Sequence, residues 1–160
     1  MNNDESGEGR VVIFASHIRS AHTKKQVSFL FSIRQVEDIV RSVHLFPVPF
    51  SPSYVAGIAN WRDRVSPALW LERVLGFHIP KQSKVRRLVM VRSHMEGQNK
   101  EMKSMIIADP PVRMVSLPIE CTPAPDFSWL PRPELVRGLF EWEEGYLLVA
   151  DMEKIASGAF

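Results

Sequence analysis

The side chains that most often carry catalysis or metal binding are five histidines, one cysteine and scattered carboxylates. The histidines are isolated, with no cysteine or carboxylate at the spacing of a metal site. They are His17, His22, His44, His78 and His94. Cys121 has no neighbouring histidine or lysine to activate its thiol, and Asp109 stands before two prolines, which is typical of a turn. The sequence therefore predicts no metal site, no cofactor and no enzymatic activity.

The basic run at 84–93, KVRRLVMVRS, is the segment that could contact a polyanion. Surfaces that bind single strands interleave aromatic rings with basic residues, and this run contains no aromatic residue. The whole chain carries a net charge of only +2, although 1–103 holds 16 Lys/Arg against 9 Asp/Glu and 104–160 holds 4 against 9. This uneven distribution of charge has two interpretations. The two parts of the chain could form faces that dock different partners, or they could be ordinary solvated surfaces. A small nucleic-acid-binding β-barrel is kept as an alternative.

Strand patterns dominate the chain. Residues 26–33 place Val27, Phe29, Phe31 and Ile33 on one face at a period of two, with serines opposite. The remaining strands are expected over 11–18, 54–61, 64–71, 84–93, two parts of 104–117 and two parts of 135–156. Many short strands with proline and glycine between them are typical of small barrels or sandwiches, so we predict an all-β fold.

The connecting segments give more local predictions. Residues 35–43 suit one helical turn or, equally, the bent end of a strand. Pro67 predicts an edge strand or a bulge, and Gly76 occupies the C-cap position of a helical turn over 71–76. Glu144-Gly145 is expected at the tip of the last hairpin, which a short helix at 151–156 follows. Residues 94–103 are expected to form a solvated loop, and 121–134 an extended proline-rich connector.

Trp61, Arg62 and Asp63 occur together at a turn between two apolar runs, within GIANWRDRVSPALWLERVLG at 57–76. This is a hairpin pattern. Asp63 is compatible with a tight turn, because aspartate is among the few residues besides glycine that adopt a positive φ. Trp61 suits core packing or an interface anchor.

The sequence resembles the CheW family, the coupling proteins of bacterial chemotaxis arrays. Three blocks at 27–77, 105–118 and 135–156 carry the resemblance, in the family's order and spacing. The first contains the counterpart of the family's Asn-Leu-Arg-Gly turn, and the last, LVRGLFEWEEGYLLVADMEKIA, is similar to the family's closing hairpin and helix. The resemblance implies two SH3-like five-stranded β-barrel lobes that share a hydrophobic core. It also implies a single CheW-like domain over 10–157, after a disordered tail at 1–9.

The family resemblance also implies partners. A groove between the lobes would bind the cytoplasmic tip of a chemoreceptor (a methyl-accepting chemotaxis protein), and another face of the first lobe would bind the regulatory domain of a CheA-like histidine kinase. We expect a cytoplasmic adaptor without catalytic activity, nucleic-acid binding or direct membrane insertion. The single cysteine fits this reducing compartment.

The resemblance assigns receptor binding to Val36, Asp38, Gly57, Asn60 and Arg62. Arg62 would reach carboxylates or helix-end carbonyls of the receptor, while Asn60 would hold the turn and Gly57 would allow a close backbone approach. The alternatives are that Arg62 is a surface residue paired with Asp63 and that the glycine and the asparagine are purely structural.

Three departures separate the chain from the family pattern. The turn reads Asn60-Trp61-Arg62-Asp63, the usual Val-x-Glu-Ile reads Val36-Glu37-Asp38-Ile39, and the first hairpin is longer than usual. These departures concern the partner more than the fold. The alternative function is therefore a CheW-like scaffold of a different signalling pathway, such as surface motility or development.

Overall fold

The computed structural model describes residues 9–41, 43–80, 87–94, 98–158 and 160. Of the predicted tail at 1–9, all residues but Gly9 lie outside the described part, as do 84–86 of the predicted strand at 84–93 and 95–97 of the predicted loop at 94–103. No helix in the described ranges is long and apolar enough to cross a bilayer.

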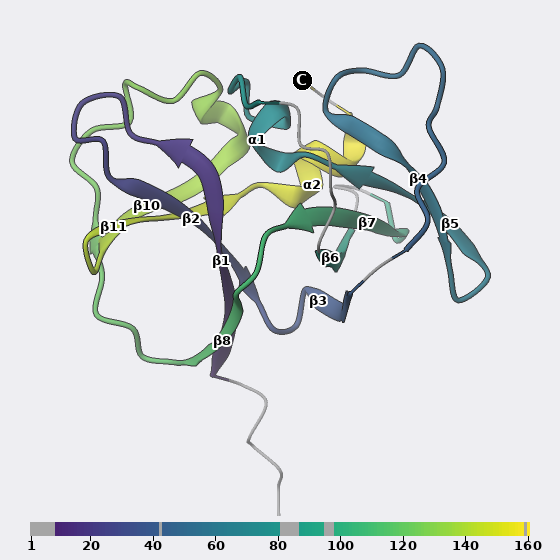
Figure 1. The fold of residues 1–160 in the computed structure, drawn as a ribbon. Helices are drawn as coiled ribbons and strands as arrows, with labels where there is room; N and C mark the ends of the chain where they lie inside the picture. Colours follow the sequence, from purple (N-terminus) through teal and green to yellow (C-terminus); the bar gives the residue numbers. More distant parts are fainter. Residues whose placement is uncertain (1–8, 42, 81–86, 95–97, 159) are drawn as a thin grey trace, which may run out of the picture.

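Two sheets lie side by side and form two lobes (Figure 1). The six-stranded lobe has the strand order β8-β1-β2-β11-β10-β9 and is built from both ends of the described chain. Its strands are β1 (Arg10–Arg19), β2 (Gln26–Ser32), β8 (Val112–Ser116), β9 (Thr122–Pro123), β10 (Val136–Trp142) and β11 (Gly145–Ala150). A 3₁₀ turn, η2 (Pro133–Leu135), precedes β10.

The five-stranded lobe comes from the middle of the chain, in the order β3-β6-β7-β5-β4. Its strands are β3 (Val36–Val40), β4 (Val55–Trp61), β5 (Arg64–Leu69), β6 (Arg87–His94) and β7 (Glu101–Ala108). The predicted all-β, two-lobed fold is confirmed. The other lobe has a sixth strand because the two-residue β9 pairs with β10 at Phe140 and Glu141.

The alternation predicted for the second strand is confirmed, since Val27, Phe29 and Phe31 are buried and the residues between them are only partly so. The open choice over 35–43 is resolved as strand for Val36–Val40, because β3 pairs with β6 through a bulge between Val36 and Asp38. Pairing with a neighbouring strand here outweighs the local helical spacing.

Two local predictions need correction. Pro67 does not lie on an edge strand, because β5 is flanked by β4 and β7, whereas the other alternative, a bulge, is found in β4 opposite Ala68 and Leu69. The proline is nevertheless accommodated, since the pairing of β5 with β7 begins only at Ala68. The loop predicted over 94–103 ends early, because β7 starts at Glu101 and pairs there with His94.

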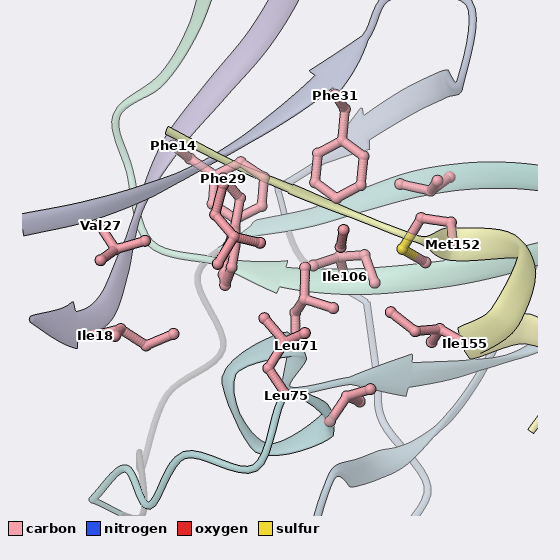
Figure 2. Close-up of a cluster of buried hydrophobic side chains, with 14 of the residues drawn as sticks. Phe14, Ile18, Val27, Phe29, Phe31, Leu71, Leu75, Ile106, Met152 and Ile155 are labelled. Carbon is pink, nitrogen blue, oxygen red and sulfur yellow. The ribbon is translucent and has the colours of Figure 1, made fainter. Parts of the chain in front are cut away.

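The largest core cluster lies between the lobes and draws on both of them (Figure 2). Phe14 and Phe29 come from the six-stranded lobe and face Leu71 and Ile106 of the five-stranded lobe. Each lobe also has an interior cluster of its own. These are Val11, Ile13 and Leu147 in the six-stranded lobe, and Ala59, Ala68, Trp70, Leu88, Met90, Met105 and Ile107 in the five-stranded lobe. The predicted shared core is therefore present.

Two short helices connect the lobes, because each follows a strand of one lobe and packs against the other lobe. α1 (Leu71–Val74) follows the five-stranded lobe's β5 and contacts β1, whereas α2 (Met152–Ser157) follows the other lobe's β11 and contacts β6 and β7. α1 ends at Val74 with Leu75 as its C-cap, one residue before the predicted cap. Gly76, at φ +89°, closes a Schellman motif in which the Gly76 and Phe77 N–H groups donate to the Arg73 and Glu72 carbonyls. We propose that 10–157 fold as one domain, because neither lobe can bury the shared core alone.

Candidate functional site

The turn between β4 and β5 presents Arg62 at a corner of the five-stranded lobe. Arg62 and Asp63 both adopt left-handed backbone conformations, with φ of +48° and +59°, and Trp61 pairs with Arg64 to close the two-residue turn. This is the type of turn that fits the twist of a hairpin. The expectation that Asp63 tolerates a positive φ is therefore met.

Arg62 is held from two sides and remains accessible. Its guanidinium lies 4.3 Å from the centre of the Trp61 ring, and its Nη2 atom is 3.7 Å from Oδ2 of Asp38 on β3. Trp61 is partly buried against the interior cluster of the five-stranded lobe, so it forms a firm base for the guanidinium. Because 67% of the Arg62 side chain is exposed, its remaining N–H groups are free to donate to a partner.

Asp38 is oriented by its own strand. Its Oδ1 atom accepts a hydrogen bond of 2.8 Å from the Ile39 N–H, which leaves Oδ2 to face Arg62. The structure thus brings together two of the five predicted residues, Arg62 and Asp38. The ion partner of Arg62 is Asp38 and not Asp63, which was the alternative drawn from the sequence.

A second ion pair lies beside this corner. Lys103 of β7 crosses to Glu37 of β3, with Nζ 2.9 Å from both carboxylate oxygens, and also lies 3.9 Å from Glu101. The hydrogen bond from Lys103 holds the pKa of Glu37 below its ordinary value, against partial burial, which raises it. Glu37 is thereby committed to the lobe's own structure, and Asp38 is the carboxylate of β3 that faces outward to Arg62.

The other three predicted residues have different positions. Val36 is buried in the shared core, so its side chain does not line a surface, which corrects that expectation. Gly57 is buried too, and a Cβ there would lie 2.7 Å from the Phe46 carbonyl oxygen. The close backbone approach at Gly57 is therefore made by the chain itself.

Asn60 was expected to hold the turn, and it does not. It is an exposed residue of β4 opposite Val65, and its side chain makes no hydrogen bond to any described residue. The turn is instead closed by the backbone of Trp61 and Arg64.

The structure also reveals an exposed apolar surface that the sequence analysis missed. Ile58 of β4 lies between two partners, Phe46 on one side and Pro67 of β5 on the other. Two positions further along β4, Asn60 lies opposite Val65 of β5. Residues opposite one another in antiparallel strands share a face, as do residues two positions apart. Phe46, Ile58, Val65 and Pro67, called the outer strip below, therefore cover one face, on which Phe46 and Val65 are 54% and 68% exposed. The apolar residues of the sequence alone do not identify this exposed face, because the opposite face of the hairpin is apolar as well.

A polar cluster at the junction of the lobes was missed as well. His17 Nε2 lies 3.0 Å from Asp109 Oδ2, and the His17 backbone N–H donates to Glu72 Oε1 at 3.1 Å. Glu72 is only 2% exposed, its Oε2 has no hydrogen-bond partner among the described residues, and burial raises its pKa. Within the described ranges, no three His, Cys, Asp or Glu side chains are grouped so as to hold a metal ion.

Comparisons with known proteins agree with this architecture. A family model described as the CheW-like domain matches residues 21–160. The crystal structure of the scaffolding protein TtCheW from Thermoanaerobacter tengcongensis is similar, with a TM-score of 0.64 and 21% sequence identity over 92% of each chain. At that identity, the similarity shows the fold and assigns no functional residue. No curated protein matches the chain.

Proposed function

The chain belongs to the CheW-like domain family, and on that premise we propose that it couples chemoreceptors to a CheA-type histidine kinase in the cytoplasm. Proteins of this family are non-catalytic scaffolds of chemotaxis signalling, so the chain is an adaptor and not an enzyme. The observation that carries the coupling role is that the β4–β5 hairpin and its neighbours present two exposed surfaces of different character. The Arg62–Asp38 corner is charged, and the outer strip beside it is apolar.

The receptor is assigned to the charged corner. A helical hairpin tip offers carboxylates and unpaired carbonyl groups, which are the acceptors that a guanidinium binds best. Asp38 and Trp61 restrict the orientations of Arg62 before the receptor arrives, which reduces the entropy lost on binding.

Substituting Arg62 tests this assignment. We expect Arg62→Ala to weaken binding of a purified receptor cytoplasmic fragment by about tenfold, because a hydrogen-bonded charge at an interface is lost. Asp38→Ala should weaken the same binding, because the guanidinium loses its orienting partner. Titration calorimetry measures both effects. Arg10→Ala removes an exposed arginine from the other lobe and should bind as the wild type does, whereas unchanged affinity in both corner variants would refute the site.

The kinase regulatory domain is assigned to the outer strip. A compact protein domain, unlike a narrow helical tip, can cover an extended apolar face, and burying such a face supplies most of the binding energy in stable complexes. The sequence predicts the kinase contact on the first lobe, without naming residues. The six-stranded lobe, which holds the first strand, also exposes an apolar side chain at Phe127, 42% exposed.

Two matched substitutions separate these locations. We expect Val65→Glu to weaken binding of the kinase regulatory domain by more than tenfold, because a carboxylate would be buried against an apolar surface. Phe127→Glu introduces the same charge on the other lobe and should leave binding intact. Pull-down of the purified kinase domain distinguishes them. If Phe127→Glu alone abolished kinase binding, the kinase site would lie on the six-stranded lobe. If the wild-type protein bound neither the receptor nor the kinase, a role in a different signalling pathway would be favoured.

A further inference from the structure

A basic cleft of about 440 Å³ lies on the six-stranded lobe, away from the hairpin of the proposed function. One wall is the end of the β1–β2 hairpin, with Arg19, Lys24 and Lys25. The opposite wall is the β10–β11 turn, and Arg113 of β8 completes the lining. Arg62, Asp38 and the outer strip do not line this cleft.

The basic wall is rigidly built. The register of β1 against β2 shifts between Ala15 and Arg19, and the amide of Gln26 spans this irregularity by donating to the carbonyls of Ser16 and Ile18. At the hairpin end, backbone hydrogen bonds of 3.0 Å join Ser20 to Lys24 and Lys25, and Arg19 Nη1 donates to the Lys24 carbonyl at 3.1 Å. Lys24 itself adopts a left-handed conformation, with φ of +57°. The three cations therefore extend from a fixed scaffold, and ordering them on binding costs less entropy.

Aromatic rings lie among the charges. Lys25 Nζ is 5.9 Å from the centre of the Tyr146 ring, and the Arg113 guanidinium carbon is 5.1 Å from that of Trp142. Glu143, 3.9 Å from Arg113, and Glu144 add two carboxylates to the lining. The cleft lining thus combines four cations, two anions and two aromatic residues, of which Tyr146 is largely buried.

Part of this wall lies outside the residues that the family model matches. The family model begins its match at residue 21, so β1 and Arg19 lie outside it. The first hairpin is also the element that is longer than usual in the sequence comparison with the family.

We propose that this cleft binds an acidic, partly apolar peptide segment of a partner protein. Carboxylates of the segment would pair with Lys25, Lys24 and Arg19, while apolar side chains would pack against the partly buried Trp142 beside the largely buried Tyr146. The carboxylates of Glu143 and Glu144 repel an uninterrupted polyanion such as a nucleic-acid strand, whereas a peptide can place an uncharged residue beside them.

A labelled peptide of alternating glutamate and leucine tests the proposal in the full-length protein by fluorescence anisotropy. We expect saturable binding that Lys25→Glu weakens about tenfold, since one attraction becomes a repulsion. Lys100→Glu makes the same change of net charge at an exposed site by the five-stranded lobe, and it should leave the affinity unchanged. The same peptide with glutamine in place of glutamate should not bind.

Three outcomes would overturn the proposal. One is an absence of saturable binding, and another is an equal loss in the Lys25 and Lys100 variants, which would indicate general charge attraction. The third is tighter binding of a single-stranded oligonucleotide than of the peptide, weakened by Lys25→Glu, which would make the cleft a nucleic-acid surface. Thermal melting verifies that both variants fold. Receptor and kinase binding should be unaffected by Lys25→Glu, so the result is independent of the function proposed above.

Discussion

Gly57→Ala is expected to lower the free energy of unfolding by about 3 kcal/mol, with a matching fall in the urea midpoint. The added Cβ would lie 2.7 Å from the Phe46 carbonyl oxygen and 3.2 Å from its carbon, which are backbone atoms that no change of rotamer can move away. The backbone at Gly57 has φ +155°, which an alanine rarely adopts. Relief requires separating Phe46 from Ile58, where two backbone hydrogen bonds of 2.8 and 2.9 Å join the segments.

Asn60→Ala is the matched control on the same strand. Asn60 is exposed and its side chain has no hydrogen bond to the described residues, so its removal should change the free energy of unfolding by less than about 0.5 kcal/mol. If Gly57→Ala instead kept full stability and lost only receptor affinity, Gly57 would serve the close approach of a partner, as the sequence-based interpretation suggested.

The strands were the most predictable part of the fold, for a physical reason. The alternation of Val27, Phe29 and Phe31 with smaller or polar residues encodes a strand with one buried face, and polar and charged residues mark the turns at its ends. β3 was less predictable, because its five residues satisfy either a helical or an extended spacing. Pairing with β6, more than 45 residues further along the chain, decides between them.

The candidate site was predictable in part. Arg62 and Asp38 were both identified, but their contact was not, since β3 and the β4–β5 hairpin are separated in sequence and lie at opposite ends of the strand order. Curvature of the whole sheet brings them together. Val36 was misassigned to a surface because a strand's sequence does not reveal which of its faces meets the second lobe.

The junction cluster shows what sequence patterns leave out entirely. Glu72 follows Leu71 in a short helical turn, a setting in which a glutamate is ordinarily solvated. It is buried because α1 packs against β1 of the opposite lobe, where the His17 N–H needs an acceptor. A contact between the lobes, and not the local sequence, thus determines that this carboxyl group is buried.

Glu72→Gln is expected to stabilise the protein by roughly 1–3 kcal/mol at neutral pH, because burial disfavours ionisation of the Glu72 carboxyl group and its Oε2 has no hydrogen-bond partner among the described residues. Burial raises the folded-state pKa of Glu72 above its ordinary 4.5, so the wild type has its full stability contribution from this group below pH 4.5 and loses it as the pH rises through the raised pKa. The advantage of the glutamine should therefore vanish in acid and grow toward neutrality. Urea titrations of the wild type and of Glu72→Gln, from below pH 4.5 to neutral pH, measure this difference in the free energy of unfolding. Glu120→Gln, at an exposed position, is the control. Glutamine still offers an oxygen to the His17 N–H, so a variant less stable than the wild type at pH 7 would mean that attraction to His17 outweighs the burial of the charge.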